Sequence, residues 1–253
     1  MLRIRADLHL HTCLSPCGGY DVTPAAVVTQ AARLGLGLIA ITDHNSAENL
    51  APALETARRL GQGAPRVLAG LEVTTREEVH LLTLFPRLAE ALTMQAMVYQ
   101  HLQPGCNRPD IFGDQVVANA EDEVEYLNPR LLIGATDLDL EQVARRAHGL
   151  GGLVIAAHLD RPSFSIVSQL GIIPSHLDLD GVEISPLNDP AQAARWLGER
   201  RLPVTTSSDA HRLEDLGRVW TELRVRRASF DELALALAGR KGRAVLGWGR
   251  RPG

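Results

Sequence analysis

The amino-acid sequence predicts an α/β fold in which strands and helices alternate along most of the chain. Such alternation is typical of a parallel sheet, either closed into a barrel or left open with helices on both faces. About seven strands are expected, and no Gly-x-Gly-x-x-Gly motif follows the first one, as it would in a dinucleotide-binding open sheet. We therefore expect a closed barrel that forms a single domain over residues 1–253.

The first elements follow from side-chain alternation and from capping residues. Residues 2–6 alternate apolar and polar side chains, as a short strand does. A helix over 24–34 has Thr23 as its cap and Gly35 as its stop. The apolar run over 36–42 has the length of a buried strand.

The strand–helix pattern continues to the end of the chain, with one interruption. Further strands are expected over residues 66–73, 79–85, 153–157, 181–184, 203–206 and 220–225, and further helices over 47–60, 88–102, 141–150, 190–200 and 230–238. Residues 104–138 are less regular, with several Pro and Gly residues before an acidic helical piece over 115–126. We interpret 104–138 as a lid-like insertion in the barrel.

Composition excludes several classes of protein. A net charge of −4 and an aromatic content of 4% indicate no extended surface for long nucleic acid. Lys241 is the only lysine and lies outside any Gly-x-x-x-x-Gly-Lys pattern, so no P-loop is present. The sequence has neither an apolar run of about 18–20 residues nor a signal-peptide core, and its three cysteines do not suit a disulfide framework. We expect a cytoplasmic protein with no membrane partner.

Most residues able to bind metal ions stand at the ends of expected strands. They are His9, His11, Asp43, His44, Glu72, His158, Asp209 and His211. The carboxyl ends of barrel strands share one face, where active sites are built, so these side chains should meet. His80 stands near the start of its expected strand, and a small shift of the strand boundary would bring it to the same face.

This set of residues is larger than one metal ion requires. A tetrahedral zinc takes four ligands, whereas here six imidazoles and several carboxylates are expected together. Sites with two or more ions stabilise the attacking and leaving oxygens of a displacement at phosphorus and generate hydroxide near neutral pH. The three remaining histidines, His101, His148 and His176, are expected on the surface or at helix ends.

The same residues carry a resemblance to a known family. Five ordered motifs, Asp7-Leu8-His9-Leu10-His11, Thr42-Asp43-His44, Gly70-Leu71-Glu72, Ala157-His158 and Ser208-Asp209-Ala210-His211, are similar to those of the PHP (polymerase and histidinol phosphatase) family. The resemblance implies a distorted (β/α)₇ TIM-like barrel, two or three divalent ions (Mn, Fe or Zn) and phosphoester hydrolysis. It also implies three ligand sets: His9, His11, Glu72 and Asp209; Glu72, His80 and His158; and His44, His211 and a residue of the loop after His11.

That last ligand is where the sequence departs from the family pattern, in which Asp or His usually stands before the glycine. Cys17 precedes Gly18 here, and a thiolate ligand would favour zinc or iron at this position. Asp21 is a second candidate, although it could instead cap the following helical region. Whether Cys17, Asp21 or neither binds stays open, and Cys13 is expected to pack in the interior.

Four further residues are expected to support the site. Asp7 and Asp43 each precede a metal-binding histidine, and they should orient an imidazole or the main chain. Arg76 and Arg161 each follow a metal-binding residue within a few positions and could bind a substrate phosphate. Residues 161–165 and the insertion are expected to form the rim of the pocket.

The sequence thus predicts a metal-dependent phosphoesterase acting on a small phosphomonoester or a nucleotide, in which Asp209 and His211 also manage protons. A nuclease acting on short oligonucleotides is an open alternative. So is a non-catalytic metal-binding module, although such a module should have lost more ligands. An amidohydrolase would want a metal-bridging lysine on a strand, which this sequence does not offer.

Overall fold

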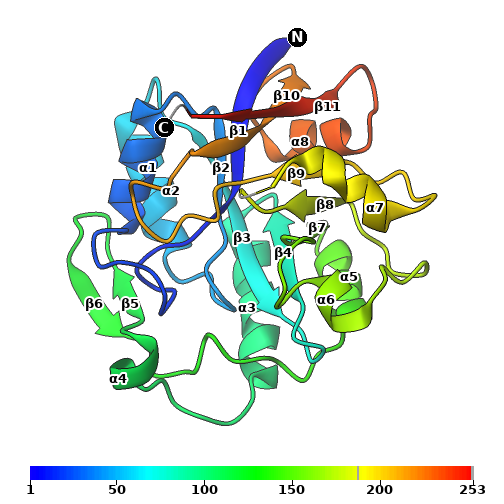
Figure 1. The fold of residues 1–253 in the computed structure, drawn as a ribbon. Helices are drawn as coiled ribbons and strands as arrows, with labels where there is room; N and C mark the ends of the chain where they lie inside the picture. The colour runs from blue at the N-terminus through cyan, green and yellow to red at the C-terminus, as the bar shows by residue number, and fades with distance from the viewer. Residues whose placement is uncertain (187, 252–253) are drawn as a thin grey trace.

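The computed structural model describes residues 1–186 and 188–251, and within them a sheet of nine strands organises the chain (Figure 1). The strand order is β11-β10-β1-β2-β3-β4-β7-β8-β9. The strands are β1 (Leu2–Leu10), β2 (Leu38–Ile41), β3 (Arg66–Thr74), β4 (His80–Phe85), β7 (Leu153–Ala156), β8 (Gly181–Ile184), β9 (Val204–Thr206), β10 (Val219–Val225) and β11 (Ala244–Arg250).

The sheet curls until β9 returns to β1 and β10. Thr206 N donates a hydrogen bond of 2.9 Å to Thr221 Oγ1, which joins β9 to β10. Just beyond β9, Ala210 forms a parallel bridge with Leu10 of β1. The expected α/β barrel is therefore confirmed as a nearly closed, barrel-like sheet, and the regular (β/α)₇ count stays a prediction.

Strand direction is less regular than the sequence predicted. β4 runs antiparallel to both β3 and β7, and β10 runs antiparallel to β1 and β11. The expectation of a wholly parallel sheet is wrong at these strands. β3 and β4 are joined by a short turn with no helix between them, and a short connection between adjacent strands gives an antiparallel pair.

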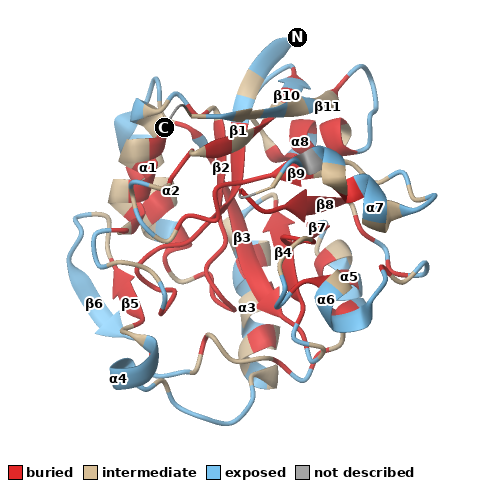
Figure 2. Ribbon diagram, in the orientation of Figure 1, coloured by how far each residue is buried: buried red, intermediate tan, exposed pale blue. Residues whose placement is uncertain are grey.

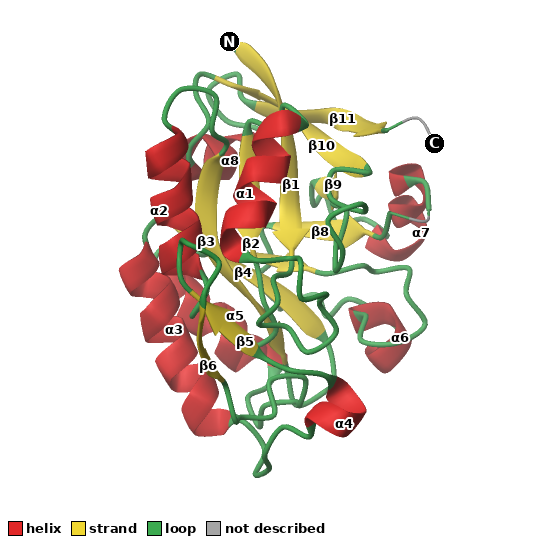
Figure 3. Cartoon of the chain, turned by 90° about the vertical axis from the view of Figure 1, so that its left-hand side faces the viewer, coloured by secondary structure: helices red, strands yellow, loops and turns green. Residues whose placement is uncertain are grey.

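Helices cover the outside of the sheet and one of its ends (Figure 3). The longer ones are α1 (Pro24–Arg33), α2 (Leu50–Leu60), α3 (Leu88–His101), α5 (Leu140–Gly149) and α8 (Phe230–Leu237), and the shorter ones are α4 (Pro109–Phe112), α6 (Ile166–Leu170) and α7 (Ala194–Leu197). Thr23 caps α1 as expected, because its side chain accepts from Ala26 N. Among the described residues, none of these helices has the length and apolar character of a membrane span.

Most strands of the sheet are buried (Figure 2), and period-two alternation gives them an outer and an inner apolar face. Val67, Leu71 and Val73 of β3 pack with the outer helices, whereas Leu68 packs in the interior with strand residues such as Leu82 and with α8. By the same alternation, Glu72 shares the inner face of Leu68, and His80 shares that of Leu82. The pattern that fills the barrel interior therefore also directs ionisable side chains into it.

Residues 115–126 were expected to be helical, and that prediction is wrong. They form a hairpin of β5 (Val116–Ala118) and β6 (Val124–Leu127) instead. Asn119 Oδ1 accepts from the main-chain nitrogens of Glu121 and Glu123, and Asp122 has a positive φ of 64°. These acidic residues thus build a turn, which side chains such as Asn stabilise against helix formation.

Two other sequence predictions also differ from the structure. The helix expected over 190–200 is a 3₁₀ turn, Pro190–Ala193, followed by α7, and it stops at Gly198 with φ 56°. The tail after α8 contains the strand β11. The sequence did not predict it, because two glycines interrupt the apolar pattern of this segment. At Gly249 a Cβ atom would lie 2.4 Å from the Trp220 ring, so this strand requires a glycine there.

Candidate metal centre

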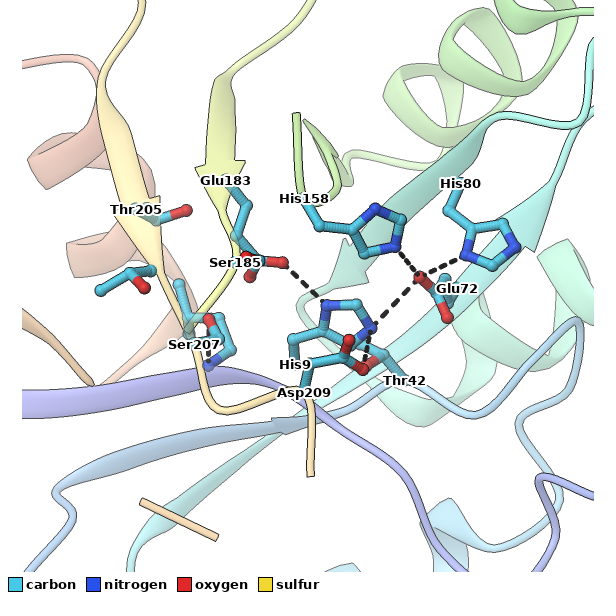
Figure 4. A network of polar contacts seen from close by, with 12 residues as sticks. His9, Thr42, Glu72, His80, His158, Glu183, Ser185, Thr205, Ser207 and Asp209 are labelled. Atoms are coloured by element: carbon cyan, nitrogen blue, oxygen red, sulfur yellow. Dashed lines mark hydrogen bonds and ion pairs between the residues drawn. The ribbon is translucent and has the colours of Figure 1, made fainter. Parts of the chain in front are cut away.

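Glu72 lies at the centre of a buried cluster of histidines (Figure 4). Its Oε1 is 3.2 Å from His9 Nε2, 2.8 Å from His80 Nδ1 and 3.3 Å from His158 Nε2. Its Oε2 is 2.9 Å from His44 Nδ1 and 3.4 Å from His11 Nε2. Five imidazoles therefore converge on one carboxylate, as the sequence predicted for residues at the strand ends.

Asp209 forms a second centre beside the first. Its Oδ1 lies 3.4 Å from His9 Nε2, 3.3 Å from His11 Nε2 and 3.7 Å from His211 Nδ1. Its Oδ2 accepts from the guanidinium of Arg161. The two carboxylates thus share His9 and His11, and every histidine expected at the site contacts one of them.

His80 joins this cluster because of strand direction. β4 is antiparallel, so its first residue lies at the same end of the barrel as the carboxyl end of β3, where Thr74 pairs with His80. The sequence prediction placed His80 correctly by allowing for an inexact strand boundary. The actual reason is the hairpin, which brings Glu72 and His80 together within one local unit.

Burial and charge set the protonation of the cluster. Burial disfavours ionisation of Glu72 and Asp209, but neighbouring imidazoles more than offset it and hold the pKa of both carboxyls well below their usual range. Burial lowers the pKa of His80 to about 4, and burial with the charges of His211 and His44 lowers the pKa of His11. Against the effect of burial, neighbouring carboxylates raise the pKa of His9 and His44, so metal ions would bind the cluster by displacing protons from these imidazoles.

Several buried nitrogens of the cluster have no hydrogen-bond partner among the described residues. They are Nδ1 of His44, His80 and His158, and the first two lie within 2.9 Å of Glu72 without hydrogen-bond geometry. His9 Nε2 and His11 Nε2 also face each other at 3.1 Å. Unpartnered buried polar atoms are rare, and a bound cation would satisfy Nδ1 of His44 and His80, whereas His158 turns Nε2 toward Glu72.

The donor atoms fall into three overlapping groups close enough to share an ion. They are His9, His11 and Asp209; His44, Glu72 and His80; and His11, His44 and His211. Imidazole and carboxylate donors suit Zn²⁺, Fe²⁺ and Mn²⁺. The residues present therefore fit divalent metal ions.

Asp7 and Asp43 lie behind the cluster and orient main chain and side chains. Asp43 accepts from Thr12 N and from Ser15 Oγ, both at 2.7 Å, and Ser15 Oγ lies 2.9 Å from His11 Nδ1. Asp7 accepts from Ser208 N at 2.9 Å and from its hydroxyl at 2.6 Å, next to Asp209 in the chain. Burial raises the pKa of both carboxyls, that of Asp7 to about 7.

Glu183 is a site residue that the sequence analysis missed. Its Oε1 lies 2.9 Å from His9 Nδ1, and the residue is only 1% exposed. It thereby fixes the ring of His9 so that Nε2 faces Glu72 and Asp209. A charged residue between Val182 and Ile184, within a strand otherwise buried, was the signal that could have identified it.

Cys17 lies where the third ligand set was expected. Its side chain is exposed but interacts with the imidazoles of His211 and His44, which lower the pKa of the thiol to about 6 against the effect of desolvation. Among the described residues, neither Cys17 nor Asp21 belongs to the three donor groups, and Asp21 is exposed with no contact there to these imidazoles. Cys13 is buried and packs with Val116 and Ala118 of β5, as expected.

The two arginines proposed for phosphate differ in position. Arg161 contacts Asp209 and its side chain is 38% exposed, so it lies at the mouth of the cluster. Arg76 is 59% exposed and its Nη2 is 3.5 Å from Asp139 Oδ2, with no contact to the cluster among the described residues. His101, His148 and His176 pair with Asp137, Asp180 and Glu141 away from the cluster.

The sequence matches two family models and resembles several known proteins. A family model described as PHP domain matches residues 7–150, and one described as PHP-associated matches 190–243. YqxK of Bacillus subtilis, an uncharacterised protein, is 27% identical over 97% of this chain and 65% of its own length. The 5'-3' exoribonuclease Rnm of Escherichia coli is 36% identical over 35% of this chain and 32% of its own length.

A solved structure is also similar. The lesion-specific endonuclease PfuEndoQ from Pyrococcus furiosus superimposes with a TM-score of 0.74 at 20% identity, over 97% of this chain and 58% of that one. This chain spans less than two thirds of the length of each of these three proteins. The first family model covers more than half of the chain, and its match begins within the first motif of the cluster. The chain belongs to the PHP domain family.

Proposed function

We propose that this chain is a metal-dependent phosphoesterase whose substrates are nucleotides or short oligonucleotides. The convergence of five imidazoles on Glu72 carries this proposal, because no simple structural role needs so many buried titratable groups around one carboxylate. The ligand sets are His9, His11, Glu72 and Asp209; Glu72, His80 and His158; and His44, His211 and Cys17. Two or three Mn, Fe or Zn ions would occupy them.

The protein's own groups have separate tasks in this proposal. Divalent ions, when bound, supply Lewis-acid activation of the phosphoester and of water. Arg161 lies at the mouth with donors that suit a phosphate oxygen, and Asp209 holds its guanidinium in place. His211 is the most exposed imidazole of the cluster, with a side chain that is 26% accessible, so it can exchange a proton with solvent.

The relatives favour a nucleotide-type substrate over other phosphoesters. Rnm is named as an exoribonuclease and PfuEndoQ as an endonuclease, so two proteins similar to this chain act on polynucleotides. The net charge of −4 favours a short substrate over an extended one. The nuclease alternative from the sequence is therefore retained, with short oligonucleotides as its substrates. The lid-like role of 104–138 and the cytoplasmic location stay predictions.

A substrate panel tests the proposal. The purified protein should contain more than one Mn, Fe or Zn per chain by elemental analysis. With added Mn²⁺ it should hydrolyse mononucleotides, nucleoside bisphosphates or short oligonucleotides faster than sugar phosphates. Full activity in the presence of chelator, with no bound transition metal, would refute it.

Cys17 has its own test, which is independent of turnover. A thiolate ligand gives Co²⁺-substituted protein a charge-transfer absorption in the near ultraviolet. We expect this band in wild type and in Cys106→Ser, an exposed cysteine outside the cluster, but not in Cys17→Ser. An unchanged band in Cys17→Ser would remove Cys17 from the ligand set.

A further inference from the structure

One short loop brings two different side chains to the cluster. Residues 157–165 connect β7 to α6, and within them Arg161 contacts Asp209 while Phe164 contacts His80. The Phe164 ring stacks on the His80 imidazole with centroids 4.7 Å apart and planes inclined by 19°. His80 Nδ1 is in turn 2.8 Å from Glu72, so one imidazole separates the phenyl ring from the centre of the cluster.

Phe164 is held in an unusual state for a phenylalanine. Its φ is 57°, in the left-handed region that bulky residues rarely adopt, and it is 37% exposed. His80 N donates to Phe164 O at 2.9 Å, and Ser165 Oγ donates to Arg161 O at 2.8 Å, which fix the loop. Backbone strain of this kind concentrates at functional sites, where surrounding contacts maintain it.

The loop thus brings a charged group to Asp209 and a flat apolar group to His80, and both side chains are partly exposed. A guanidinium binds phosphate oxygens, and an exposed aromatic ring stacks with a base of any sequence. A nucleotide joins these two chemistries, with a sugar between them. Tyr20 and Phe112 are other exposed aromatic residues, but neither has a contact with the cluster among the described residues.

We propose that Phe164 is the base-stacking residue of this site, so that a nucleobase lies on its ring while the attached phosphate lies between Arg161 and the histidines. The proposal rests on the phosphoesterase function above and narrows its substrates to those that carry a base next to the reacting phosphate. A purely structural role for Phe164, shielding His80 from water, is the competing explanation.

Paired substrates distinguish these two roles. Adenosine 5'-monophosphate is compared with ribose 5-phosphate, and a short oligonucleotide with the same oligonucleotide ending in an abasic sugar. The metal-loaded protein is assayed as wild type, Phe164→Leu and Phe164→Trp. Leucine keeps the apolar cover over His80 without an aromatic face, and tryptophan keeps the face. Circular dichroism and metal content establish that each variant is folded and loaded.

We expect Phe164→Leu to lower kcat/KM for the base-bearing member of at least one pair by about 5- to 150-fold, the range of one base stack. The base-less member should change by less than about twofold, and Phe164→Trp should resemble wild type. The pair that responds identifies the substrate as a free nucleotide or a polynucleotide end. Equal losses for both members would overturn the proposal in favour of shielding.

A binding measurement separates this inference from the function on which it rests. Calorimetry with a non-hydrolysable phosphonate analogue of the nucleotide, and with its base-less counterpart, reports stacking without turnover. Base-dependent binding that Phe164→Leu abolishes supports the inference even if no phosphoester is hydrolysed, a result that would refute only the proposed function. Equal binding of both ligands to wild type would refute the inference alone.

Discussion

The interior of the barrel has two halves that differ in chemistry although the same strands line both. On β3, Leu68 is buried among apolar side chains, whereas Glu72 on the same face contacts five imidazoles. On β4, Leu84 packs in the apolar half and His80 in the polar half, and Leu82 between them pairs with Glu72. Four positions along each strand are enough to pass from one half to the other.

The difference shows how stability and chemistry are divided within one core. Burial of the leucines contributes folding free energy of about 25 cal/mol per Å² of apolar surface. Burial of carboxylates and imidazoles costs free energy unless they are paired or bind ions. We therefore expect the apolar half to hold the fold together and the polar half to depend on metal ions.

The largest effect should come from removing a charge in the polar half. Asp209→Asn or His9→Ala should lower turnover by about 10³-fold or more, because transition-state charge loses its stabilisation, while the fold persists. Steady-state kinetics and thermal unfolding measure the two effects. Asp215→Asn, a carboxylate paired with Arg218 outside the cluster, is the matched control and should retain activity. An active Asp209→Asn would contradict the proposed division.

A cavity in the apolar half should have the opposite outcome. Leu68 is buried and lies four positions from Glu72, so Leu68→Ala should lower the free energy of unfolding by about 2–5 kcal/mol. Metal content per folded chain should not change. Leu92→Ala on the exposed side of α3, where the residue is 40% exposed, should cost much less. Urea unfolding with elemental analysis tests this, and loss of metal from Leu68→Ala would show that the halves are coupled.

Removal of the metal ions should lower the free energy of unfolding of the wild type, because only the polar half depends on them. An ion present at 100 times its Kd stabilises by about 2.7 kcal/mol, which corresponds to a Tm change of roughly 5–10 °C for a chain of this size. Scanning calorimetry with chelator, and then with Mn²⁺ restored, should show this shift in wild type and a smaller one in Asp209→Asn. An unchanged Tm after proven metal loss would mean that the apolar half suffices.

A smaller effect is expected behind the cluster. Glu183→Gln should weaken metal binding by about 10- to 100-fold, because His9 loses the carboxylate that fixes its ring. Glu222→Gln on β10, which loses only the surface pair with Arg3, serves as control. Competition titration with a chromophoric chelator measures both, and equal affinities would show that His9 needs no such support.

The smallest effect concerns pH and lies outside both halves. The hydrogen bond with Asp180 raises the pKa of His148 above 6.5, and Asp178 adds to this against partial burial. His148 therefore binds its proton more tightly in the folded state than in the unfolded state. The stabilisation of the folded state by this charged pair is complete below pH about 6.5 and is lost as pH rises through the folded pKa of His148.

The test compares wild type with His148→Gln and Asp180→Asn. Both variants should be less stable than wild type at low pH by less than about 1 kcal/mol, and the difference should shrink as pH rises. Urea unfolding across pH measures it. A difference that grows with pH would contradict the assignment of the charged pair.

Local sequence patterns predicted much of this molecule. Strand-end positions identified His9, His44, Glu72 and Asp209, because side chains at the carboxyl ends of barrel strands meet whatever the loops do. The direction of β4, the hairpin of β5 and β6 and the strand β11 could not be predicted. Each depends on contacts between distant residues, such as Gly249 against Trp220, which no local periodicity records.

The contacts of the site that the sequence did not predict also join residues that are distant along the chain. Glu183 acts on His9 across 174 positions, and its strand alone gave only an oddly placed charge. Arg76 stands as close to its motif in sequence as Arg161 does, yet it pairs with Asp139 away from the cluster. Distance along the chain could not distinguish the two arginines.

The meeting of β9 with β1 has a consequence for how the protein unfolds. Asp7 of β1 and Ser208 just beyond β9, 201 positions apart, are joined by hydrogen bonds at this junction, beside the bridge between Leu10 and Ala210. A cation held by His11 and Asp209 would span that same junction and act as a removable cross-link between the two ends of the barrel. Such a cross-link closes a loop from His11 to Asp209, which is most of the chain. The protein would therefore unfold more slowly when metal ions are bound than when they are removed.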